Sequence, residues 1–210
     1  MAAIKYVHAG QFYNSGIMQT QINREQKMVK LMVVILLFSS FGVVSTATGI
    51  ELVIGEQRVE PGIVFVFEGA IKDQVIPASM HLPEEETHVH IEARVNWDDQ
   101  NIPAGTPPGG FVPYLRISAK VTHQSTKLMS YIDLLPHINL VDNFHYARNM
   151  ALPGGIGDLY SVSFTVSRLS PDAVALHKDW LDSYGTPIVE EQVFEYTDVD
   201  FSEIANASRR

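Results

Sequence analysis

The stretch THVHIEARV, Thr87 to Val95, decides the fold, because polar and apolar side chains alternate along it. One face collects Val89, Ile91, Ala93 and Val95, and the other collects His88, His90, Glu92 and Arg94. A period of two is typical of a β-strand that turns one face toward a core. We therefore predict a half-buried strand here, with its apolar face against the interior.

The polar face of this strand carries a histidine and a carboxylate two residues apart. His90 and Glu92 have Cα atoms roughly 6.5–7 Å apart in an extended chain, and their side chains are parallel. An imidazole and a carboxylate held side by side on a rigid strand are half of a metal site. The alternative interpretation is a solvated strand face that merely carries polar residues.

Short apolar or alternating runs recur along the rest of the chain, with glycine and proline turns between them. Predicted strands cover Ile50–Ile54, Ile63–Phe67, Val112–Thr122, Lys127–Leu135, Leu159–Ser167 and Ile188–Tyr196. Ala70–Pro77 is expected to extend the second of these after a kink, and Asp98–Gly110 to form a loop. Helical character is confined to Ala173–Leu181. Such a series of short strands predicts an all-β protein, a β-sandwich.

The first 47 residues have the pattern of an N-terminal extension followed by a signal peptide. Lys30 provides the charge, Leu31–Val44 the apolar run, and Ser45-Thr46-Ala47 a small-residue cleavage site. Met28 is a second candidate for the initiator methionine. The alternative to a cleaved signal peptide is an uncleaved N-terminal membrane anchor. We expect residues 48–210 to form a single metal-binding domain.

Charge and the lack of cysteine limit the ligands that this protein is expected to bind. The chain has 15 basic and 24 acidic residues, and only one of the acidic residues precedes residue 48. An acidic surface argues against nucleic acid and suits cations. No cysteine is present, so disulfides and thiolate metal sites are excluded. No nucleophile–base pair, phosphate loop or cofactor fingerprint is apparent, so we do not expect an enzyme of an established catalytic class.

Histidines outside the strand could complete a metal site, because loops at one end of a sandwich converge. His137 follows a predicted strand, His145 lies in the expected loop DNFHYARNM, and His177 lies in the helical segment. Met80 precedes the Thr87–Val95 strand by one short loop. Imidazole suits copper, zinc and iron, thioether selects copper, and carboxylate favours iron. The spacing alone does not choose among these metals.

VHIEARV, the loop before FVPYLRIS, the run DNFHYARN and the later His177 resemble the periplasmic iron-transport protein family. The resemblance covers about Phe65 to Tyr196, and the H-x-E strand and the D-x-x-H-Y loop carry it most specifically. It implies an immunoglobulin-like or cupredoxin-like β-sandwich that binds Cu(II) and Fe(II) or Fe(III). It also implies a periplasmic homodimer, with partner-chain residues near the metal, that serves high-affinity iron uptake beside a membrane iron permease.

The resemblance also implies a set of metal-binding residues. They are Met80, His90, Glu92, Asp142, His145 and His177, with Glu68 as an N-terminal iron-binding glutamate. The chain departs from the family where a second methionine is expected, because it reads Leu135-Pro136-His137 with a one-residue length difference. His137 is then expected to replace that thioether, which makes the site harder and weakens a preference for Cu(I).

Three functions follow as alternatives. The first is a copper- and iron-binding protein that passes iron to a permease. The second is a copper-dependent oxidase of ferrous iron coupled to transport. The third is a structural, adhesion-type sandwich whose histidines are incidental.

Overall fold

The structure is a computed structural model that describes residues 51–167, 173–185 and 188–208. Eight antiparallel strands make up most of it. They are β1 (Glu51–Val59), β2 (Ile63–Ala70), β3 (Val89–Trp97), β4 (Arg116–His123), β5 (Met129–Ile138), β6 (Phe144–Met150), β7 (Leu159–Ser167) and β8 (Gln192–Asp200). Four short helical segments accompany them: η1 (Ala78–Met80), η2 (Glu84–Glu86), α2 (Lys178–Tyr184) and α3 (Ser202–Asn206).

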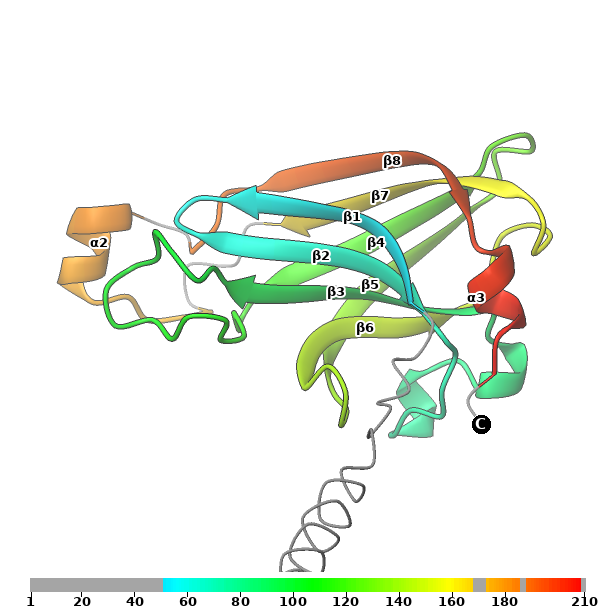
Figure 1. Ribbon diagram of the computed structural model, residues 1–210, viewed down its shortest axis with the longest axis horizontal. Helices are drawn as coiled ribbons and strands as arrows, with labels where there is room; N and C mark the ends of the chain where they lie inside the picture. The colour runs from blue at the N-terminus through cyan, green and yellow to red at the C-terminus, as the bar shows by residue number, and fades with distance from the viewer. Residues whose placement is uncertain (1–50, 168–172, 186–187, 209–210) are drawn as a thin grey trace, which may run out of the picture. The chain divides into compact units, whose positions relative to one another are not determined.

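The strands follow the order β1-β2-β3-β6-β5-β4-β7-β8. β5 belongs to both halves of this arrangement, because Met129–Leu134 pairs with β4 and Leu135–Ile138 pairs with β6. Pro136 follows this change of partner. Figure 1 shows the strands as two layers, with α2 and α3 near opposite ends. This arrangement confirms the predicted all-β sandwich.

The apolar faces of the strands fill the space between the layers. Phe67 of β2 and Phe164 of β7 are fully buried, and their rings stack with centroids 4.1 Å apart. The predicted inward set of β7, namely Tyr160, Val162, Phe164 and Val166, is buried as expected. Val89, Ile91, Ala93 and Val95 of β3 are also fully buried. The period-two pattern therefore identified the core side of both strands.

The two end strands of the sheet, β1 and β8, come together in a tight contact. Tyr196 of β8 lies directly over Gly55 of β1, where an added Cβ would overlap the ring. The Tyr196 hydroxyl also accepts a hydrogen bond from Gln57 at 3.3 Å. This contact brings the two edge strands close and leaves the sheet nearly closed.

Several local predictions differ from the structure. DNFHYARNM is largely strand β6 rather than a loop, because its main chain pairs with both β3 and β5. Residues after Ala70 do not extend β2 as a strand. β3 is buried on both faces along most of its length rather than half-buried.

The helix predicted for Ala173–Leu181 is shorter and begins later in the structure, where α2 covers Lys178–Tyr184. The predicted signal peptide and Met28 lie outside the described residues. Within the described part of the chain, no helix is both long and apolar enough to cross a membrane.

Candidate metal centre

The candidate site lies on the outer face of the sheet, opposite the core. Strand register fixes this position: His145 of β6 is paired with His137 of β5, and His90 of β3 with Asn149 of β6. Cross-strand partners share a face, and the odd-numbered core residues of β3 point the other way. The polar face predicted for Thr87–Val95 therefore does carry the site.

Residues 73–82, between β2 and β3, form a covering segment that lies over this face and explains its burial. The Asn149 side-chain amide donates hydrogen bonds to the main-chain carbonyls of Asp73 at 2.8 Å and Leu82 at 2.9 Å. Arg148 likewise donates to the carbonyl of Met80 at 2.7 Å. The covering segment is therefore fastened to β6 at three points. His90 is only 5% exposed beneath it.

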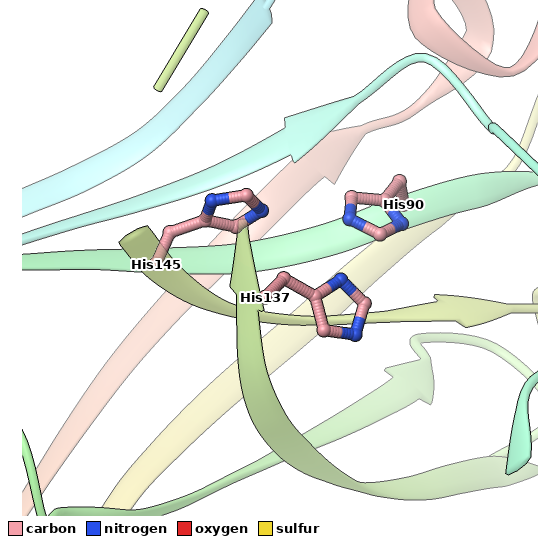
Figure 2. A group of neighbouring side chains, drawn as sticks. All are labelled: His90, His137 and His145. Atoms are coloured by element: carbon pink, nitrogen blue, oxygen red, sulfur yellow. The ribbon is translucent and has the colours of Figure 1, made fainter. Parts of the chain in front are cut away.

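Three imidazoles meet on this face, one from each of β3, β5 and β6. His90, His137 and His145 each offer a ring nitrogen, and these atoms lie within 4.8 Å of one another. Figure 2 shows the three rings gathered around a common volume. Their ring centroids are 5.3, 5.7 and 6.1 Å apart. A small shift of the side chains would bring three nitrogens to one metal ion at about 2 Å each.

Hydrogen bonds to the backs of two rings orient them for metal binding. His90 Nδ1 lies 2.7 Å from the Asn149 Oδ1 atom, and His145 Nδ1 lies 3.1 Å from the carbonyl oxygen of Asn143. The Asn149 amide nitrogen is already donating, so its oxygen accepts from His90. Both rings therefore carry their proton on Nδ1 and direct the lone pair of Nε2 toward the site.

A second cluster, of carboxylates, adjoins the histidines. Oxygens of Glu51, Glu92 and Asp142 lie within 4.8 Å of one another. Glu92 links the two clusters, since its Oε2 atom is 3.8 Å from His145 Nε2. Burial, reinforced by the charges of Asp142, Glu68 and Glu51, raises the pKa of Glu92 to about 8. The negative charges of these carboxylates repel one another, and a cation bound between them would relieve the repulsion.

The surroundings of His137 and His145 favour the neutral form of these two rings by lowering their pKa values. Burial, together with the neighbouring His90 and His145, lowers the pKa of His137 to about 3. Burial also lowers the pKa of His145. The nitrogens His137 Nε2 and His145 Nε2 and the oxygen Glu92 Oε1 are buried with no hydrogen-bond partner. Unpaired buried nitrogen and oxygen atoms of this kind fit a metal ion.

A cavity of about 580 Å³ opens beside the three imidazoles. His90, His137 and His145 line its inner part, and Met80 and His81 line it from the covering segment. Met80 is 48% exposed, so its thioether lies at the outer part of this space. The cavity gives an ion a path from solvent to the rings.

The structure places the remaining predicted ligands differently. Asp142 joins the carboxylate cluster, whereas both Glu68 oxygens accept hydrogen bonds from Arg94 at 2.5 and 2.6 Å. His177 immediately precedes α2 and belongs to neither described cluster. Glu51, which the sequence analysis did not name, joins Glu92 and Asp142 in this cluster. Nothing in its local pattern indicated this, because Glu51 reaches the site only through the pairing of β1 with β2.

Comparison with known proteins places the chain in a family. Residues 48–203 match the model of the family described as Fe2+ transport protein. The chain belongs to this family. A 34 kDa membrane antigen of Treponema pallidum (strain Nichols) is 32% identical over 96 residues, which span 46% of this chain and 46% of the antigen.

Solved structures share the fold. Copper-reconstituted P19 from Campylobacter jejuni has a TM-score of 0.59 and 24% identity, covering 71% of this chain and 95% of P19. A copper-bound variant of FetP from uropathogenic Escherichia coli strain F11 has a TM-score of 0.57 and 20% identity, covering 70% of this chain and 95% of FetP. The match to the family model confirms the resemblance to an iron-transport family.

Proposed function

We propose that this protein binds copper and iron in the periplasm and serves high-affinity iron uptake. The convergence of His90, His137 and His145 from three adjacent strands carries the proposal. Family membership supports the role in iron transport. Copper-bound P19 and FetP, which share the fold, support copper as one of the metals.

Copper is assigned to the imidazoles. Neutral nitrogen ligands suit Cu(II), and the tautomers of His90 and His145 present Nε2 to the site. Because the pKa of His137 is far below neutrality, this ring needs to lose no proton before it binds. His137 also provides a nitrogen at the place where the family resemblance implies a thioether.

Iron is assigned to the carboxylates. Fe(II) and Fe(III) are harder ions than copper and gain more from oxygen ligands. Glu51, Glu92 and Asp142 offer three such oxygens beside the copper ligands. Glu92 lies between the clusters, so it could contact either ion. Iron is here cargo, and we infer that a membrane permease receives it.

Copper titration of His90→Ala tests the assignment. We expect a loss of Cu(II) affinity of at least tenfold in equilibrium dialysis, because the variant removes an oriented, buried ligand. His88→Gln is the control: His88 Nδ1 accepts a hydrogen bond from the Leu152 amide, and His88 does not line the cavity. Equal affinities for wild type and His90→Ala would reject the proposed copper site. Absence of copper binding to the wild type would favour an adhesion-type role.

Copper-dependent oxidation of ferrous iron is the second candidate function. The proximity of the imidazole and carboxylate clusters favours it, since Glu92 Oε2 is 3.8 Å from His145 Nε2. Loss of Fe(II) can be followed in air with the copper-loaded protein. Many turnovers per copper would establish an oxidase, whereas stoichiometric loss would support binding and transport.

A further inference from the structure

His81 contacts the metal centre, although sequence spacing gives it no role. It follows η1 in the segment that covers the outer face of the sheet, and it lines the 580 Å³ cavity together with the three imidazoles. Its ring meets that of His137 edge-on, with centroids 4.9 Å apart and an interplanar angle of 74°. This is the shortest centroid separation in the histidine cluster.

The ring nitrogens of this pair are suitable for binding a metal ion. His81 Nδ1 and His137 Nε2 are both buried, and neither has a hydrogen-bond partner. Two imidazoles bound to one ion at about 2 Å, with tetrahedral angles, have centroids about 5 Å apart. The observed separation fits that value. Burial, and then the positive charge of Arg148, lower the pKa of His81.

His81 also occupies a distinct place in the cavity. His137 is the only ring with which it makes a described ring contact, so His81 extends the cluster outward rather than completing a ring around one point. His81 also lines a second cavity, of about 600 Å³, together with Met80, Asp133 and Arg148. His81 is only partly buried and lines both cavities, so an ion that enters from solvent can reach it.

We propose that His81 is a metal ligand, and that His81 and His137 form an outer binding position for a copper-type divalent ion. The inference rests on the proposed function, since it assumes that ions reach the inner histidines. An ion held by the outer pair needs to exchange only His81 for His90 and His145 to move inward. His137 remains bound throughout, so the transfer never leaves the ion without an imidazole ligand.

Zn(II), a diamagnetic stand-in for Cu(II), tests this through the ¹⁵N resonances of the histidine rings. We expect His81 Nδ1 to shift on titration, along with ring nitrogens of His90, His137 and His145. In His90→Ala the inner position is impaired, and the His81 shift should persist. Shifts at His90, His137 and His145 with an unmoved His81 would overturn this inference alone. A titration that moves none of the four rings would overturn the proposed metal centre as well.

Cu(II) loading provides a second measurement. His81→Gln should slow the rate of loading in stopped-flow absorbance by about tenfold, because the outer position is lost. The matched His88→Gln variant should load at the wild-type rate. Thermal melts show whether each variant is folded. Wild-type loading kinetics in a folded His81→Gln protein would count against the proposal.

Discussion

Glu92 is the residue on which the two clusters depend. Its carboxyl group is 1% exposed, and it lies with Glu51 and Asp142 on one side and His145 on the other. Arg94, the nearest base, already holds both oxygens of Glu68. With its pKa raised to about 8, the Glu92 carboxyl group keeps its proton at neutral pH in the metal-free protein, and a bound cation would replace that proton.

Replacing Glu92 by glutamine should distinguish the two metals. Glu92→Gln preserves the shape of the side chain and removes the carboxylate that a bound metal ion would create, so we expect iron affinity to fall about tenfold more than copper affinity, or about 1.4 kcal/mol. Competition titrations with each metal measure this difference. An equal loss for both metals would show that Glu92 is a shared ligand, and unchanged affinities would show that it binds neither.

The low pKa of His137 gives a pH-dependent stability. A base whose pKa is lowered in the folded state stabilises the fold above its unfolded pKa of 6.5, and this contribution declines as pH falls toward 3. We expect the metal-free protein to lose about 1–2 kcal/mol more than His137→Gln between pH 7 and pH 5. Urea unfolding at both pH values measures it. Parallel pH profiles would contradict the assigned environment of His137.

The same pKa bears on metal release. An imidazole with an ordinary pKa is protonated as pH falls through about 6.5, and the proton displaces the bound metal ion. His137 binds protons only near pH 3, so its share of the copper affinity should persist to more acidic pH.

At the scale of elements, the contact between β1 and β8 depends on the absence of a side chain at Gly55. Gly55→Ala would place a Cβ against the outer end of the Tyr196 ring, so this ring must turn away or the two edge strands must separate. We expect the free energy of unfolding to fall by about 1–3 kcal/mol, as for other overpacked sites. Denaturant unfolding provides the measurement.

Gly157→Ala is the matched control for this substitution. An added Cβ at Gly157 meets no atom within 4 Å, so the free energy of unfolding should change by no more than about 0.5 kcal/mol. Equal stabilities of the Gly55→Ala and wild-type proteins would show that the Tyr196 ring moves aside without loss of stability.

At the scale of the whole molecule, an exposed apolar patch adjoins the metal centre. It consists of Ile138, Leu140, Val141 and Phe144, around the turn between β5 and β6. Leu140 is fully exposed and Phe144 is 48% exposed, whereas His145, the next residue, is buried in the site. Clusters of exposed apolar side chains commonly mark protein–protein contacts.

We propose that this patch contributes to the homodimer implied by the family resemblance. Sedimentation at micromolar concentration should show a species of twice the chain mass. Leu140→Lys would place a charge in the apolar patch and should shift that species toward the monomer. Val53→Lys, at an exposed position on β1, is the control and should leave the dimer unchanged. A wild-type protein that sediments only as a monomer would reject the proposal.

The sequence by itself determined most of the strands and, for Thr87–Val95 and Leu159–Ser167, the side that faces the core. Alternation along Thr87–Val95 and Leu159–Ser167 needs only the local geometry of an extended chain, so it could be recognised without the fold. The same local geometry placed His90 and Glu92 side by side. It failed at DNFHYARNM, because β6 owes its strand conformation to pairing with β3 and β5 rather than to a pattern of its own.

Only the tertiary structure decided which distant groups meet. His137 and His145 lie opposite each other because of the register between β5 and β6. Glu51 reaches Glu92 across β2, and neither contact can be recognised from local sequence patterns. The burial of the polar face likewise depends on the segment after Ala70, which the sequence suggested would continue a strand. These contacts are long-range pairings, and their consequences for pKa and metal binding arise only once the sheet and its cover have assembled.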